Sequence, residues 1–125
     1  DEYASIVDSV VNVLTHIDEM DVETLGKAVT DIEQFKLSMN DYMDLMMMWY
    51  RDAMMLTVTG NVDKILFKNE FSTLKKQAGN LTFKSIEDKI DAIAKAEQRL
   101  LANADFEVTM ELLLLTLKEE ASPEE

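Results

Sequence analysis

The sequence predicts an all-α protein, a compact bundle of about six helices packed around one central apolar helix. Apolar residues recur every three or four positions in successive segments, and this spacing places them on one face of a helix. The 125 residues include only three glycines and one proline, and 47% of them are hydrophobic. A chain of this length and composition can bury a core of ordinary single-domain size. No segment shows the alternation of a half-buried strand.

The first two helices are expected on either side of Asp21. That residue can accept a hydrogen bond from the first turn of the helix that follows it. Gly26, inside the second helix, is expected to let a neighbouring helix approach closely. The apolar stripes that define the two helices are Tyr3, Ile6, Val7, Val10, Val13, Leu14 and Ile17, then Val22, Leu25, Val29, Ile32 and Phe35.

The central helix is predicted between Ser38 and Gly60, at about residues 38–59. Ser38 and Asp41 fit a capping box, and glycine is typical after the end of a helix. The residues from 45 to 50 are all apolar and point in every direction, so the middle turns should have no solvent-exposed face. Thr57 to Thr59 predict a weakly helical last turn. The segment is too short and too charged to span a bilayer, which needs about 20 apolar residues.

The second half of the chain predicts three more helices. Residues 61–67 are ambiguous between a buried loop and the start of a helix, and a short helix is expected over 69–78. Thr82 caps the next helix, which should end near Ala102; its stripe includes Ile86, Ile90, Ile93, Ala94, Leu100 and Leu101.

The last helix is expected to begin after Asp105 and to run to about Lys118. It contains four consecutive leucines, residues 112–115, which predict a mostly enclosed helix. The remaining residues, 119–125, include four glutamates and Pro123, a composition typical of a disordered acidic tail. The predicted domain is therefore 1–118.

The composition excludes several classes of function. A formal charge of −13 opposes contact with nucleic acid or anionic lipid, both of which need clustered Lys and Arg. The absence of cysteine excludes disulfides and thiol chemistry and fits a cytoplasmic protein. The chain begins at Asp1 without a methionine, so we expect it to be a domain of a longer protein.

Residues that carry chemistry are scarce. His16 is the only histidine, and no acid lies three residues before it, where helical metal sites place one. We therefore predict no catalytic residue, no metal and no cofactor, and expect His16 to be a partly exposed helix residue. The methionines fit either core filling or an adaptable binding groove. Those that crowd the central helix are Met43, Met46, Met47, Met48, Met54 and Met55.

The segment LMMMWYRDAMM begins at residue 45 and contains Trp49, Tyr50, Arg51 and Asp52. It resembles a helix with an apolar-W-[YF]-R-D-apolar pattern in the C-terminal domain of the bacterial DNA polymerase III delta-prime subunit. At least one of Trp49 and Tyr50 is expected in the core. Arg51 is expected to pair with a nearby group, because a charge next to the most buried turn needs one.

The second segment, AEQRLLANADFEVTMELLLLTL from residue 96, is similar to the ending of the same domain. That ending is a helix, N-x-N, then apolar-E-x-L-L-L-x-L. Asn103 matches the first Asn, Glu111 the Glu, and residues 113–117 the leucine run. Asp105 stands where the second Asn is usual, and Asp caps a helix equally well.

The resemblance implies a non-catalytic collar domain of the clamp loader, which places the sliding clamp on primed DNA. The implied partners are the collar domains of the tau/gamma and delta subunits, with no direct contact to nucleic acid or membrane. Other interpretations are the collar of delta or of tau/gamma, or a stand-alone helical adaptor with a Met-rich groove. An enzymatic bundle is disfavoured because no usable His, Cys or phosphate loop is present.

Overall fold

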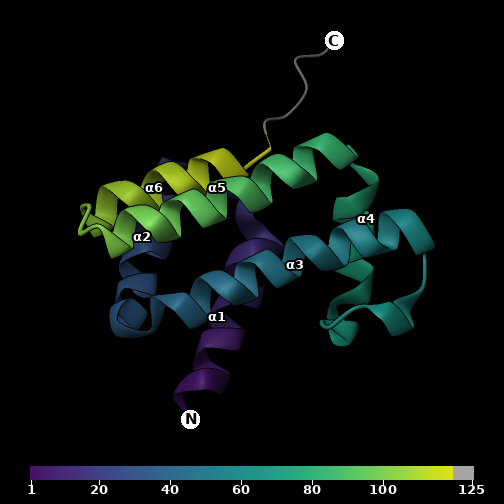
Figure 1. Ribbon diagram of the computed structural model, residues 1–125, viewed down its shortest axis with the longest axis horizontal. Coiled ribbons are helices and arrows are strands. Elements are labelled where there is room, and N and C mark those ends of the chain that lie inside the picture. The colour runs from purple at the N-terminus through teal and green to yellow at the C-terminus, as the bar shows by residue number, and fades with distance from the viewer. Residues whose placement is uncertain (120–125) are drawn as a thin grey trace.

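The computed structural model describes residues 1–119 and is all-α, as predicted (Figure 1). Within that part of the chain no strand is found. The helix α3 contacts α1, α4 and α5, and α2 packs on α6. The α-helices are α1 (Glu2–His16), α2 (Val22–Ile32), α3 (Met39–Thr59), α4 (Phe71–Gly79), α5 (Phe83–Leu101) and α6 (Phe106–Leu117).

The first two helices begin at aspartates. The carboxylate of Asp1 accepts from Ala4 N–H at 2.8 Å, and Asp21 forms a capping box with Thr24. The predicted stripes extend too far, because Tyr3 is 54% exposed and Val22 is 87% exposed. Both lie in first turns, which project beyond the neighbouring helices. The prediction for Gly26 is also wrong, since no atom of a neighbouring helix lies within 4 Å of the position of a Cβ there.

The start of α3 differs from the predicted capping box. A 3₁₀ segment, Glu33–Ser38, follows α2 directly and leads into Met39. The Ser38 side chain makes no capping bond and instead donates to Glu2 Oε1 at 3.1 Å. The last turn is regular α-helix up to Gly60, whose φ of +66° favours glycine. Thr57 and Thr59 therefore lie in the helix, contrary to prediction.

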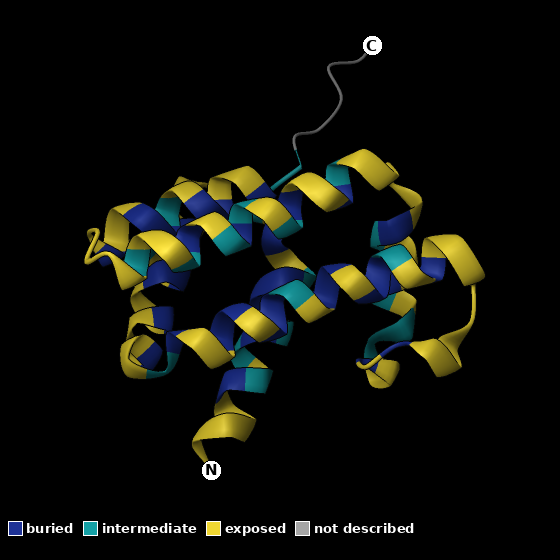
Figure 2. Ribbon diagram, viewed as in Figure 1, coloured by how far each residue is buried: buried dark blue, intermediate teal, exposed yellow. Residues whose placement is uncertain are grey.

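The helix α3 is central but keeps a solvent-exposed stripe, which the sequence analysis did not predict (Figure 2). Met48 and Met55 are each 37% exposed on that stripe, and Asp44 and Arg51 lie along it. The physical reason is that α1, α4 and α5 leave one side of α3 uncovered. Methionines on its other sides fill the core, including Met39, Met43 and Met46.

A half-buried glutamine joins three helices at the edge of this core. Gln77 of α4 accepts from Trp49 Nε1 at 2.9 Å and donates to the Leu14 carbonyl of α1 at 2.8 Å. A second polar link joins α3 to α1, because the Tyr42 hydroxyl is 2.7 Å from Ser9 Oγ. These bonds satisfy polar atoms that would be costly to bury alone.

The segment between α3 and α4 is a loop with two 3₁₀ turns, Val62–Lys64 and Lys68–Glu70, and most of its residues are exposed. Ile65 and Phe67 point into the core and are 3% and 8% exposed. Phe67 packs edge-to-face on Trp49, with ring centroids 5.4 Å apart. Of the two predicted possibilities for this segment, the structure shows the loop, with Ile65 and Phe67 buried and Leu66 59% exposed.

The last two helices form an antiparallel hairpin. Thr82 begins α5 with a capping box to Ser85, and Asp105 begins α6 by accepting from Val108 N–H at 2.9 Å, both at predicted positions. The expectation that α6 is mostly enclosed is wrong for its outer side, because Leu112 and Leu115 are 53% and 54% exposed. Successive residues of a helix point 100° apart, so four consecutive leucines cannot all face one core.

Glu119, the first residue of the predicted tail, makes two hydrogen bonds to the helical part of the chain. Glu119 Oε2 accepts from the buried Lys89 Nζ at 2.6 Å, and Glu119 N–H donates to Asp18 at 2.8 Å. The rest of that tail, residues 120–125, lies outside the described residues. No helix in the part of the chain that the structure describes has the length and apolar character to cross a membrane.

Candidate interaction groove

The first group of predicted motif residues lies mostly in the core. Trp49 is fully buried and Tyr50 is 2% exposed, so both are structural. Burial raises the pKa of Tyr50, and the charges of Asp18 and Glu119 add to this effect. The phenol therefore stays neutral at physiological pH and serves the packing of α3.

The other two residues of that motif have opposite environments. Arg51 is exposed, and no ion pair within residues 1–119 includes it, so the expected pairing is not found. Its place on the open stripe of α3 lets water solvate the guanidinium. Asp52 is 6% exposed and accepts from the backbone N–H of Leu66 and of Phe67 at 3.0 and 2.8 Å. Asp52 thus fixes the loop that carries Phe67 into the core.

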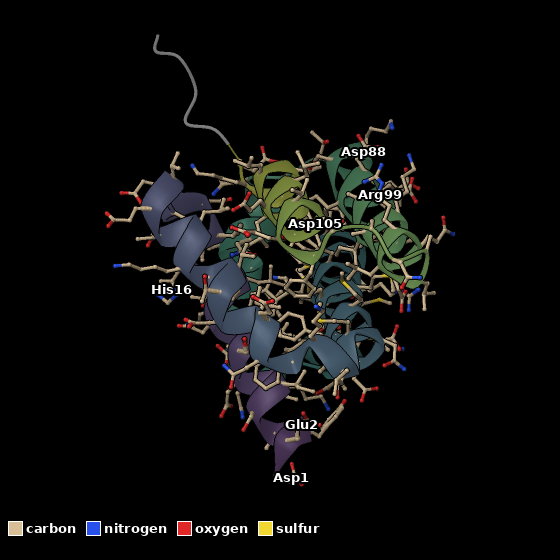
Figure 3. The ribbon with its side chains drawn as sticks, turned by 90° about the vertical axis from the view of Figure 1, so that its left-hand side faces the viewer. Asp1, Glu2, His16, Asp88, Arg99 and Asp105 are labelled. Atoms are coloured by element: carbon tan, nitrogen blue, oxygen red, sulfur yellow. The ribbon has the colours of Figure 1, made fainter. Side chains whose placement is uncertain are left out.

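The second motif lies at another end of the molecule, in the turn between α5 and α6. Figure 3 looks onto this end, with Asp105 toward the viewer. Asn103 has a φ of +65°, a left-handed conformation that Asn adopts more readily than most residues. Asp105 fixes the first turn of α6. Glu111 is half-buried on α6 and is not part of this turn.

This turn forms one wall of a groove with a volume of about 570 Å³. The opposite wall is the junction of α2 and α3, which brings Leu37 and Met39 to the groove. Its other lining residues are Lys36, Asn40, Glu97, Leu100, Leu101, Asn103, Ala104, Asp105 and Phe106.

Two exposed leucines mark the groove. Leu37 is 99% exposed and Leu101 is 78% exposed. Behind them, Met39 and Phe106 are each 8% exposed, so the floor joins the core. Lys36 Nζ lies 6.0 Å from the centre of the Phe106 ring, which is the outer limit of a cation–π contact. An apolar floor with exposed apolar edges is suited to bind an apolar side chain of another protein.

Glu97 of α5 lines the groove and is half-buried there. Burial raises the pKa of Glu97, and the charge of Asp44 on α3 adds to this effect. No group of three or more His, Asp or Glu residues in the described chain is placed to hold a metal ion. His16 is exposed, as predicted, and its Nδ1 lies 2.9 Å from the Asn12 carbonyl.

The motif residues therefore do not come together in one site. Leu101 was predicted on the apolar stripe of its helix, and this is wrong because it is 78% exposed; Leu37 was not among the predicted residues. One signal was available. Leu100 and Leu101 are adjacent on a helix whose stripe is narrow, so only one of them can face the core. For Leu37, the kink at Phe35 (φ −100°, ψ 18°) decides the direction of the side chain, and the sequence carries no sign of it.

One curated protein is similar to this chain in sequence. Over 77 residues the chain is 32% identical to the DNA polymerase III subunit delta-prime of Bacillus subtilis strain 168. This chain is similar to a delta-prime subunit. The matched region covers 62% of the chain and 23% of the length of that subunit. The chain matches no protein-family profile and no solved structure. The predicted relation to delta-prime is confirmed to that extent, and the collar assignment stays a prediction.

Proposed function

We propose that this chain is the helical collar domain of a delta-prime-like subunit of the DNA polymerase III clamp loader. In this proposal the domain is non-catalytic and holds neighbouring subunits together while the complex loads the sliding clamp onto primed DNA. The sequence similarity to a delta-prime subunit supports the assignment to DNA polymerase III. The all-α fold and the scarcity of catalytic side chains support an assembly role.

The observation that carries the assembly role is the groove with Leu37 and Leu101 at its edges. Fully burying one exposed leucine contributes about 1.5–3 kcal/mol, so two leucines can contribute substantially to a contact. A position in a ring of unlike subunits needs two different surfaces on each domain. The groove is proposed as one of them.

The proposed partners are the tau/gamma and delta subunits. The test uses the purified chain with purified tau/gamma and delta from the same organism, analysed by size-exclusion chromatography. Co-elution of this chain with either subunit is expected. Leu37→Glu and Leu101→Glu should each weaken the association at least tenfold, because each places a charge against an apolar partner surface.

Val22→Glu is the matched control, since Val22 is a similarly exposed apolar residue on α2, outside the groove. All three positions are exposed, so circular dichroism should show unchanged helicity and thermal unfolding. Failure of the wild-type chain to associate with either subunit would refute the proposed function. Association that is unaffected by the two leucine variants would refute the role of the groove.

A further inference from the structure

The outer side of the α5–α6 hairpin is a second exposed surface, separate from the groove. Leu112 and Leu115 project from it and are each about half exposed. A shallow depression of about 340 Å³ runs between the two helices beside Leu112. Its lining residues are Asp88, Asp91, Ala92, Lys95, Ala96, Arg99, Leu112, Leu113 and Thr116. Figure 1 shows the two helices side by side along one edge of the molecule.

The charges on α5 follow an order along this surface. Asp88 and Asp91 lie toward the start of α5, Lys95 and Arg99 lie toward its end, and Ala92 lies between the two pairs. Asp91 and Lys95 are each two residues from position 93, while Asp88 and Arg99 are five and six residues from it. Asp88 and Arg99 lie on the outer side of α5 in Figure 3. The charges therefore change from negative to positive near position 93.

The leucines are arranged about the same point. Lys89 Nζ of α5 donates to the Leu117 carbonyl of α6 at 3.0 Å, so residues 89 and 117 lie at the same level of the hairpin. Because the helices are antiparallel, position 93 lies level with about position 113. Leu112 and Leu115 flank the point between 113 and 114, within about one residue, or 1.5 Å, of that level.

We propose that this surface binds a second copy of the chain about a two-fold axis that crosses both helices near positions 93 and 113. Such an axis places each helix antiparallel to its own copy. Asp88 then faces Arg99 of the second copy, and Asp91 faces its Lys95. Leu112 faces Leu115 of the second copy, and the small Ala92 lets the two α5 helices approach.

Charge complementarity identifies the occupant. A two-fold contact joins a surface to itself, so it requires a self-complementary pattern. Among the charged residues of α5 that line the depression, the acids come first and the bases last. This order is self-complementary only in the antiparallel arrangement, where opposite charges meet and leucines meet leucines. Asp88 also pairs with Lys84 at 2.6 Å, but both side chains are largely exposed, and such a pair is weak enough to rearrange. The two hairpins would together form a four-helix bundle.

The test measures the mass of the chain by sedimentation equilibrium from 10 µM to 1 mM. The buffer has physiological ionic strength, where the Debye length is about 8 Å, so that salt screens the repulsion between the acidic chains. A concentration-dependent dimer is expected. Arg99→Asp should weaken it at least tenfold, because it places like charges opposite Asp88. The double variant Asp88→Arg/Arg99→Asp restores opposite charges and should restore the dimer. Lys75→Asp is the control, a charge reversal at an exposed residue on α4.

Cysteine cross-linking gives a second measurement, because the native chain has no cysteine. Ala92→Cys lies near the proposed axis and should form a disulfide-linked dimer on mild oxidation, faster than the exposed control Val22→Cys. A chain that stays monomeric at 1 mM would overturn the proposal. So would a dimer that Arg99→Asp does not weaken, or equal cross-linking of the two cysteine variants.

Discussion

Asp52→Ala should destabilise the fold by about 3–4 kcal/mol, although residue 52 lines neither the groove nor the depression on the α5–α6 hairpin. The carboxylate accepts from Leu66 N–H and from Phe67 N–H, and the second of these bonds is fully buried. A hydrogen bond to a charged group contributes about 1.5–3 kcal/mol, and a buried donor left without a partner costs a similar amount. Water can reach the Leu66 N–H, so its loss should cost about 1 kcal/mol.

The assay is urea unfolding followed by circular dichroism, with hydrogen exchange of the two amides by NMR. The variant should lose protection at 66 and 67 before the rest of the chain unfolds, because the carboxylate is what fixes this loop. Asp52→Asn should cost less, since its carbonyl still accepts one bond. Asp44→Ala, at an exposed position of α3, is the control and should change stability by less than about 0.5 kcal/mol. A loss below about 1 kcal/mol for Asp52→Ala, with amide protection unchanged, would refute the reasoning.

Three further predictions concern stability. Gln77→Ala should cost about 2–4 kcal/mol in urea unfolding, because it removes the acceptor of Trp49 Nε1 and a donor to the Leu14 carbonyl; a change within 0.5 kcal/mol would contradict this. Asp105→Ala should cost about 1 kcal/mol through loss of the α6 cap, measured in the same way, with an unchanged midpoint as the contrary result. Burial raises the pKa of Tyr42 to about 12, against about 10 in the unfolded chain, so its contribution is complete below pH 10 and is lost between pH 10 and 12. The difference between the two pKa values corresponds to about 3 kcal/mol. Between pH 7 and pH 12 the free energy of unfolding of Tyr42→Phe should therefore fall less than that of the wild type. An equal fall in the two proteins would count against this assignment.

Only part of the candidate groove could be predicted from the sequence. The matches at Asn103 and Asp105 led to the correct turn, and the cap at Asp105 follows from local chemistry alone. Leu37 was not predicted, because its exposure depends on the kink at Phe35 and on which helices meet there. Arg51 was expected to pair, but whether a position on α3 faces water depends on how many neighbours cover that helix.

The sequence by itself determined the helices, their main caps and the apolar character of α3, because these depend on spacing and on contacts within one turn. It also indicated the relation to delta-prime that the comparison with Bacillus subtilis supports. Only the tertiary structure decided which apolar residues stay exposed. Leu112 and Leu113 are chemically identical neighbours, yet one is 53% exposed and the other 3% exposed. Burial is a property of the packed neighbours of a side chain, and long-range contacts place those neighbours.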